Sequence, residues 1–153
     1  MMNTRSSLSF LLVLTMTACS TPGSWYAKNS LRHIEIVAAA DANQSSPTSI
    51  DIVFAMSEDS ASELPNTSLE WYQGRSSFLG ILGSNVSVVT LELPPAKTVD
   101  DIEFPENAWK ARSIVLYADY LDKNSQLAFR LERHRRVAVY LNRNSVEIME
   151  LDK

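Results

Sequence analysis

Eight short segments rich in β-branched and other apolar residues dominate the chain from residue 31 onward, and they constrain its fold more than any other feature. Residues 33–37 place Ile34 and Ile36 on one face, and residues 49–55 repeat the alternation. Alternation with a period of two predicts half-buried strands. Further strands are expected at residues 86–93, 102–104, 113–121, 127–131, 137–141 and 146–151. Short strands at regular spacing predict an all-β sandwich.

Some of these segments also indicate how the strands are arranged. Residues 113–121 are apolar on both faces, which predicts a central strand covered from both sides. Residues 33–37 and 49–55 are expected to pair as a hairpin across a polar loop at residues 41–48. The turn sequence at residues 142–145 predicts a second hairpin between the last two strands.

One segment departs from the strand pattern. Thr67 followed by Glu70 matches a capping box, in which a hydroxyl and a carboxylate accept hydrogen bonds from the free amides of a helix N-terminus. The pattern predicts one short helix over residues 68–79, inserted between the second and third strands. Gly74 lies inside this helix and lowers its stability by up to about 1 kcal/mol relative to alanine.

The first 18 residues have the layout of a secretory signal peptide. Arg5 is the only charge before an apolar stretch at residues 8–16, and the small residues Thr17 and Ala18 follow. The stretch is too short for a transmembrane helix, which needs about 20 apolar residues. Its position at the extreme N-terminus argues against a buried core helix. We expect residues 1–18 to be removed on export.

Cys19 is the only cysteine in the chain and would become the first residue of the mature protein. Residues 14–19 (LTMTAC) resemble the lipobox of bacterial lipoproteins, which implies acylation of Cys19, palmitate-type chains included, and export to the outer membrane because Ser20 follows. Two or three acyl chains hold a protein on a membrane almost permanently, since each buried methylene contributes about 0.8 kcal/mol. An ordinary secreted protein with a free thiol is the alternative. The expected organisation is a signal peptide at 1–18, a lipidated cysteine and tether at 19–30, and a β-sandwich domain at 31–153.

The net charge of −4 argues against nucleic acid as a partner, because phosphate contacts need an excess of basic residues. Loss of Arg5 with the signal peptide leaves 13 basic and 18 acidic residues, a net charge of −5. We therefore expect the acyl chains, and not the protein surface, to anchor the domain. The one basic cluster in the sequence comprises Arg130, Arg133, His134, Arg135 and Arg136. We interpret this cluster as a solvated bend between two strands; the alternative is a surface that binds an acidic partner or lipid headgroups.

No pattern in the sequence indicates catalysis. His33 and His134 are the only histidines, and their spacing matches no metal-binding motif such as HExxH. No GxSxG motif or glycine-rich phosphate loop is present. The adjacent carboxylates at 58–59 and 100–101 point their side chains apart. We expect no enzyme activity, no metal or other cofactor and no small-molecule substrate.

Three stretches carry a resemblance to a known family. Residues 37–43 (VAAADAN) lead into residues 46–54 (SPTSIDIVF), and residues 111–120 (ARSIVLYADY) combine an aliphatic run with alanine, tyrosine and a following polar turn. Two prolines at 94–95 and a closing hairpin at 137–151 follow in the expected order. Together these features resemble the type VI secretion outer-membrane lipoprotein family, TssJ, also called SciN. The resemblance covers most of the mature chain and implies a transthyretin-like two-sheet β-sandwich.

The resemblance implies a structural subunit and not an enzyme. Proteins of this family are held by their acyl chains in the outer membrane, face the periplasm and bind the periplasmic domain of the inner-membrane subunit TssM, which helps to build the trans-envelope complex. The small polar residues of the first loop suit an adaptable polar interface. The candidate partner-binding residues are Asp41, Asn43, Gln44, Ser45, Ser46 and Pro47.

Two other functions remain open. One is an assembly or pilotin-like lipoprotein of another envelope secretion system, whose client would lie in the outer membrane. The other is a periplasmic enzyme or inhibitor with an unrecognised site, which requires polar groups that converge in a pocket of the folded domain.

Overall fold

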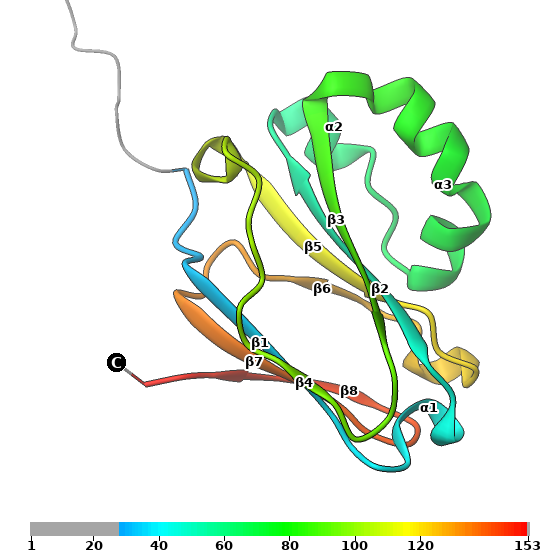
Figure 1. The fold of residues 1–153 in the computed structure, drawn as a ribbon. Coiled ribbons are helices and arrows are strands. Elements are labelled where there is room, and N and C mark those ends of the chain that lie inside the picture. The colour runs from blue at the N-terminus through cyan, green and yellow to red at the C-terminus, as the bar shows by residue number, and fades with distance from the viewer. Residues whose placement is uncertain (1–27, 153) are drawn as a thin grey trace, which may run out of the picture.

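The computed structural model of this 153-residue chain describes residues 28–152. The predicted signal peptide and Cys19 lie outside the described residues. Eight strands form two four-stranded sheets that pack face to face, and helices cover the outer face of one of them (Figure 1). The prediction of a two-sheet β-sandwich of about eight strands is confirmed.

Each sheet combines strands from distant parts of the described chain. The first sheet consists, in spatial order, of β4 (Thr98–Val99), β1 (His33–Ala38), β7 (Arg136–Leu141) and β8 (Val146–Glu150). The second consists of β3 (Val86–Leu93), β2 (Thr48–Ala55), β5 (Ser113–Ala118) and β6 (Ala128–Arg130). The helical elements are α1 (Ala42–Ser45), α2 (Glu58–Ser62), α3 (Ser68–Leu82) and the 3₁₀ turns η1 (Gly83–Asn85), η2 (Ala108–Lys110) and η3 (Lys123–Ser125). Within the sheets, β1 and β7 run parallel, and the other neighbouring strands are antiparallel.

The strands β1 and β2 do not form a hairpin, which corrects the expectation from the sequence. β1 pairs with β4 and β7, whereas β2 pairs with β3 and β5. The chain therefore crosses from one sheet to the other in residues 39–47. β1 alternates half-buried and buried positions as predicted. Alternation identifies the face that a strand buries, but it does not identify the neighbouring strand.

The region between β3 and β5 also differs from the prediction. Residues 102–104 form no strand, and Ile102 and Phe104 instead anchor an irregular segment to the core. The Phe104 ring lies 5.5 Å from the ring of Phe54, measured between centroids. The short strand β4 provides the ladder to β1 in this region. The closing hairpin of β7 and β8 is confirmed.

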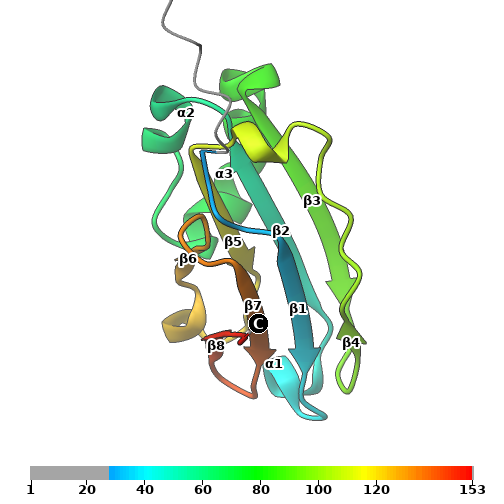
Figure 2. The ribbon, with the colours of Figure 1, turned by 90° about the vertical axis from the view of Figure 1, so that its left-hand side faces the viewer.

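The main core lies between the two sheets. Its inward-facing side chains include Ile34, Ile36, Ile50, Ile52, Phe54, Ile114, Leu116, Val137, Val139 and Leu141, all at most 1% exposed. β5 is buried at all six positions because the other sheet covers one face and α3 covers the other (Figure 2). The prediction that this strand is central and covered from both sides is confirmed.

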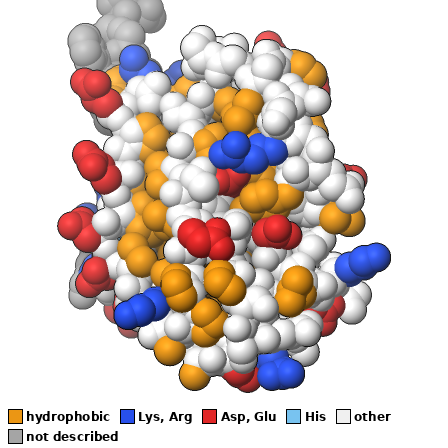
Figure 3. All heavy atoms as spheres, turned by 45° about the vertical axis from the view of Figure 1, so that its right-hand side comes forward, with side chains coloured by type: hydrophobic (Ala, Val, Ile, Leu, Met, Phe, Trp, Pro, Cys, Tyr) orange, Lys and Arg blue, Asp and Glu red, His pale blue; other side chains and the backbone are white. Residues whose placement is uncertain are grey.

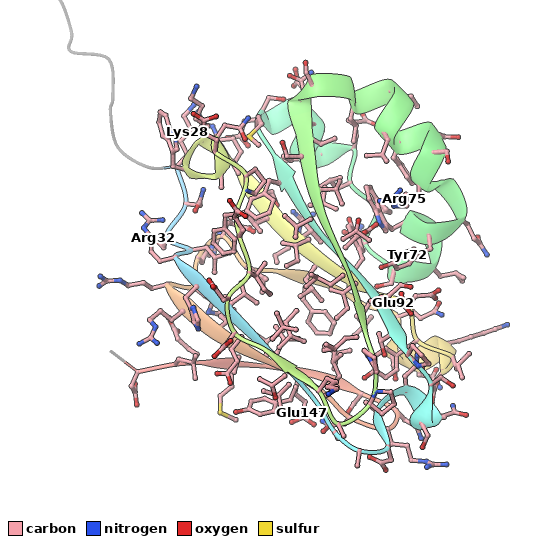
Figure 4. The ribbon with its side chains drawn as sticks, viewed as in Figure 1. Lys28, Arg32, Tyr72, Arg75, Glu92 and Glu147 are labelled. Atoms are coloured by element: carbon pink, nitrogen blue, oxygen red, sulfur yellow. The ribbon has the colours of Figure 1, made fainter. Side chains whose placement is uncertain are left out.

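A second, smaller core fixes α3 to the outer face of the second sheet, and a buried carboxylate lies within it. Asp51 of β2 is fully buried. Its Oδ2 atom accepts hydrogen bonds from Trp71 Nε1 at 2.8 Å and Arg75 Nε at 2.6 Å, and its Oδ1 atom accepts one from Thr90 Oγ1 at 2.6 Å. Trp71 stacks on Tyr117 of β5 with ring centroids 4.9 Å apart. Figure 4 shows Arg75 reaching from α3 towards the sheet.

Both longer helices begin at capping side chains. The Thr67 hydroxyl accepts a hydrogen bond from the Glu70 amide at 3.2 Å, as the capping pattern predicts, and α3 extends three residues beyond its predicted end. Ser57 and Ser60 cap α2 reciprocally. α2 was not expected from the sequence, although a serine pair three residues apart is a recognisable signal for it.

The strand directions give the sandwich two opposite ends (Figures 1 and 2). At one end lie Lys28, the first described residue, and the first residues of β1, β5 and β7; we call this the tether end. At the other end lie the connections at residues 39–47, 94–97, 119–127 and 142–145; we call this the loop end. A partner at the loop end would therefore contact the end of the domain opposite Lys28, where the described chain begins.

Candidate functional site at the loop end

Backbone hydrogen bonds join the connections of the loop end into one surface. The amides of Asn43 and Gln44 donate to the carbonyls of Asn142 at 3.1 Å and Arg143 at 3.2 Å. The amide of Ala96 donates to the carbonyl of Ala39 at 3.0 Å. Three connections that are distant in the sequence are therefore held side by side.

The Asn43 side chain extends this network to a fourth connection. It is 2% exposed. Its Nδ2 atom donates to the carbonyls of Pro47 and Asp119, both at 3.2 Å, and its Oδ1 atom accepts from the Leu121 amide at 2.8 Å. Asn43 thus fastens its own loop to residues 119–121 and is not itself open to a partner.

The predicted partner-binding residues form a tight left-handed turn. Asn43, Gln44 and Ser45 have φ values of 46°, 58° and 65°, a conformation that costs a non-glycine residue about 1–2 kcal/mol. Asp41, Gln44, Ser45 and Pro47 are exposed and Ser46 is half-buried, whereas Asn43 is buried. The structure brings these six residues together at the tip of the loop end and leaves four of them open to solvent.

The connection at residues 119–127 is fixed by side chains that contact the β7–β8 turn. The Tyr120 hydroxyl donates to the Asn142 carbonyl at 2.8 Å, and burial raises the pKa of Tyr120 to about 12. Ser125 Oγ donates to the Asn144 carbonyl, and Gln126 Nε2 donates to the Tyr120 carbonyl. This connection is consequently a rigid neighbour of the left-handed turn.

Two leucines in this connection give the loop end an apolar flank. Leu121 is 62% exposed and Leu127 is 56% exposed. The sequence assigned both to strands, but β5 ends at Ala118 and β6 begins at Ala128, so Leu121 lies outside the sheets and Leu127 makes only an isolated bridge with Thr67. Sequence reasoning therefore missed them. Exposed apolar side chains beside polar loops are typical of protein interfaces.

Carboxylates give the same region a negative character. Asp41, Glu92, Asp119, Asp122 and Glu147 lie on or beside these connections. Partial burial and, to a smaller extent, the nearby Glu92 raise the pKa of Asp119. Figure 3 shows acidic side chains near the centre of this face and along the left edge below the grey chain, and basic side chains that lie singly; the lower part of the face carries both charges. A partner at this end would be favoured by complementary basic groups.

No group of three or more potential metal-ligating side chains occurs in residues 28–152. His134 Nδ1 lies 3.6 Å from Glu150 Oε2, at the tether end and away from the candidate surface. Of the adjacent carboxylates at residues 58–59, Glu58 is exposed and forms an ion pair with Arg112 at 3.4 Å. The chemistry of the loop end is that of a polar and apolar contact surface.

The part of the chain that the structure describes contains no helix that is both long and apolar enough to span a bilayer. Of the predicted tether, the structure describes residues 28–30, and these are hydrogen-bonded to the domain. Asn29 is buried, and its Nδ2 atom donates to the carbonyls of Ala108 at 2.9 Å and Ala111 at 3.1 Å.

Comparisons with known proteins link this architecture to one group of solved structures. No protein-family model and no curated protein matches the sequence. The type VI secretion lipoprotein TssJ1 from Pseudomonas aeruginosa matches with a TM-score of 0.61 and 13% identity, over 80% of this chain and 96% of that chain. Lip from Serratia marcescens, a membrane-bound component of the type VI secretion system, matches with a TM-score of 0.54 and 10% identity, over 79% and 96% of the two chains.

A third match is a chain in the structure of the TssM C-terminal domain, a type VI secretion protein, from EAEC. Its TM-score is 0.53 and its identity 14%, over 78% of this chain and 97% of that chain. Identities this low establish a shared fold and carry no residue-level correspondence. The chain therefore has the β-sandwich fold of the solved TssJ lipoproteins of type VI secretion.

Proposed function

We propose that this chain is a lipoprotein of the type VI secretion trans-envelope complex, anchored in the outer membrane through acylated Cys19 and facing the periplasm. The observation that carries the proposal is the TssJ fold, which spans nearly the whole length of the solved lipoproteins. The lipobox-like sequence before the single cysteine supports the same conclusion independently of the fold.

We further propose that the loop end binds the periplasmic domain of TssM. The exposed residues Asp41, Gln44, Ser45 and Pro47 would make polar contacts, and Leu121 would add apolar area beside them. Asn43 would act as a positioning residue, because its side chain is already occupied by the protein. The loop end suits this role because it lies opposite the end at which the chain emerges towards Cys19 (Figure 1).

In this proposal the protein is a scaffold and catalyses no reaction. The space between the sheets is filled by apolar side chains. Four surface hollows of the described residues lie at the tether end or beside it, away from the proposed interface. Rigid packing of the loops suits a subunit that holds two other components in a fixed relation.

Affinity capture from the envelope of the producing cell tests the partner. The wild-type protein and the Cys19→Ser variant should both recover TssM, because the acyl chains localise the domain and do not form the interface. Fractionation should find the wild type in the outer membrane and the Cys19→Ser variant in the soluble periplasm. Recovery of a secretin, or of no envelope subunit, would contradict the proposal and favour a pilotin-like role.

A pair of matched substitutions tests the interface. Leu121→Arg places a charge on an exposed leucine at the loop end, and Ile81→Arg does the same on an isoleucine in α3 that is 76% exposed. Leu121→Arg should weaken TssM binding at least about tenfold, since a charge without a partner in an interface costs more than 1.4 kcal/mol. Ile81→Arg should leave binding unchanged. Equal effects of the two substitutions would exclude the loop end as the interface.

A further inference from the structure

At the tether end the fold gathers basic side chains that are dispersed in the sequence. Residues 28–32 lie between two other segments: the Lys28 amide donates to the Trp109 carbonyl at 3.1 Å, and the Arg32 amide donates to the Arg135 carbonyl at 2.8 Å. The three segments together present Lys28, Arg32, Trp109, Lys110, Arg133 and Arg135, which we call the tether-end patch. The sequence showed only the part of this patch that lies in the 130–136 cluster.

All six side chains of the tether-end patch are exposed. Trp109 is 45% exposed, and Lys110 Nζ lies 5.1 Å from the centre of its ring. None of the five basic side chains has a carboxylate within ion-pair distance among residues 28–152. Figure 4 shows Lys28 and Arg32 pointing outwards at this end. The positive charges are therefore free to meet an anionic surface.

Several carboxylates at the same end are already engaged within the protein. Glu58 pairs with Arg112 at 3.4 Å, and Glu150 faces His134 at 3.6 Å. Glu132 Oε2 accepts a hydrogen bond from the Ile114 amide at 3.2 Å. The remaining carboxylates near this end include Asp59, Glu63, Glu103, Glu106 and Asp152. At the loop end, three basic side chains, Lys97, Lys123 and Arg143, lie among the five carboxylates named above.

A hollow adjoins the tether-end patch, and two of the six patch residues, Lys28 and Arg133, line it. The hollow, of about 490 Å³, is lined by Lys28, Asn29, Ser30, Glu58, Arg112, Glu132 and Arg133. Three of these residues are cationic and two are the engaged carboxylates. A phosphate group is small enough to enter a hollow of this size, and arginine and lysine are its usual ligands.

We propose that the tether-end patch lies against an anionic phospholipid surface, with the basic side chains on lipid phosphates and Trp109 at the level of the headgroups. Exposed tryptophan beside lysine and arginine is the combination that membrane interfaces favour. The proposal rests on the proposed anchor at Cys19, which lies nine positions before Lys28 and so within about 30 Å of the patch along the chain. The acidic loop end then points away from the membrane towards the periplasm.

Cys19 allows the proposal to be tested without the cell's own lipidation, because it is the only cysteine. The mature chain, residues 19–153, is coupled through this thiol to maleimide-bearing lipid in vesicles of phosphatidylcholine with or without phosphatidylglycerol. The readout is quenching of Trp109 fluorescence by lipids with brominated tails. The signal of a Trp109→Phe variant is subtracted, which removes the contributions of Trp25 and of Trp71, the latter fully buried.

The charge-reversal variants form a matched pair. Lys28→Glu, Arg133→Glu and Arg135→Glu together change the tether end, and Lys97→Glu, Lys123→Glu and Arg143→Glu make the same change of charge at the loop end. We expect Trp109 quenching in the phosphatidylglycerol vesicles that declines as salt is added. The tether-end variant should lose it and the loop-end variant should keep it, because each basic residue near an anionic surface changes partitioning about fivefold.

Equal quenching in the two kinds of vesicle, no quenching in either, or equal losses in the two variants would overturn the proposal. The result does not depend on acylation in the cell or on TssM, because the coupling is chemical. Failure of the proposed anchor would instead appear in the fractionation of the wild type and the Cys19→Ser variant. The two proposals can therefore fail separately.

Discussion

Asn43 determines the shape of the loop end through one side chain and one backbone conformation. Its amide group contacts two carbonyls and one amide of two separate segments. Its φ of 46° starts the left-handed turn that exposes Gln44 and Ser45. Asparagine is the non-glycine residue that tolerates this region best, because its short polar side chain can satisfy nearby backbone groups.

Two substitutions at Asn43 separate these contributions. Asn43→Gly keeps the left-handed conformation and removes the side-chain hydrogen bonds, which should lower the free energy of unfolding by about 1–2 kcal/mol. Asn43→Ala removes the same bonds and adds the strain of a positive φ, for a loss of about 2–3 kcal/mol. Urea unfolding measures both. Equal losses would mean that the backbone conformation contributes nothing.

The buried Asp51 carboxylate should matter more than its hydrogen-bonding partner Thr90. Asp51→Asn turns a donor towards Trp71 or Thr90 and removes the charge that pairs with Arg75, so a loss of about 2–4 kcal/mol is expected. Thr90→Val keeps the shape of a side chain that is already exposed and should cost only about 1 kcal/mol. If chemical denaturation ranks these variants in the reverse order, the carboxylate does not anchor α3.

Asp119 gives the loop end a predictable dependence on pH. Its pKa is raised in the folded state, so folding disfavours the ionised form and the cost is present at neutral pH. The cost disappears as the pH falls below the ordinary aspartate value, about 4, where the group is protonated in both states. Asp119→Asn should therefore raise the melting temperature at pH 7 and have little effect below pH 4. A larger gain in acid than at pH 7 would contradict this assignment.

For the strands and helices, the local sequence patterns predicted where an element forms better than which strands pair with each other. The alternation in β1, the unbroken apolar run of β5 and the cap at Thr67 each report a local environment, and all three predictions hold. β1 pairs with β7, about a hundred residues away, and no local pattern contains that information. Ile102 and Phe104 gave a strand-like signal because they are anchored in the core, but they have no ladder.

In the candidate site, too, the sequence predicted local features but not long-range contacts. Its small polar residues marked residues 41–48 as a loop, and the structure places the tip of that loop on an exposed surface. The burial of Asn43 depends on contacts with residues 119–121 and 142, which only the folded chain supplies. Leu121 looked like the end of a strand because apolar residues precede it without interruption. The sequence did not predict the tether-end patch as a whole, because the patch combines side chains from three segments that are distant in the sequence.

The two inner glycines of α3 differ in their surroundings and should respond differently to alanine. A Cβ at Gly80 would meet no atom within 4 Å, so Gly80→Ala should raise the free energy of unfolding by about 0.5–1 kcal/mol through helix propensity. A Cβ at Gly74 would lie 2.7 Å from Phe78 Cε2, and the Phe78 ring stacks near Trp71. Gly74→Ala should therefore show no such gain. Thermal unfolding of the two variants makes the comparison, and a larger gain at Gly74 would contradict it.

At the scale of the whole molecule, most basic side chains lie at the end of the sandwich where the described chain begins. Residues 28–152 contain twelve lysine and arginine side chains, and most lie at the tether end with the emerging chain. The loop end is acidic and carries the left-handed turn and the exposed leucines. In the proposed role as a bridge between the outer membrane and an inner-membrane subunit, the tether end would face the membrane and the loop end would face the protein partner.

Site-specific photo-crosslinking in the producing cell tests this polarity most directly. A photoreactive amino acid replaces Gln44 at the loop end in one strain and Trp109 at the tether end in another, because both side chains are exposed. The account predicts a crosslink to TssM from position 44 and none from position 109. A crosslink to TssM from position 109 and not from position 44 would contradict the proposed orientation, and a crosslink to a different envelope protein from position 44 would contradict the proposed partner.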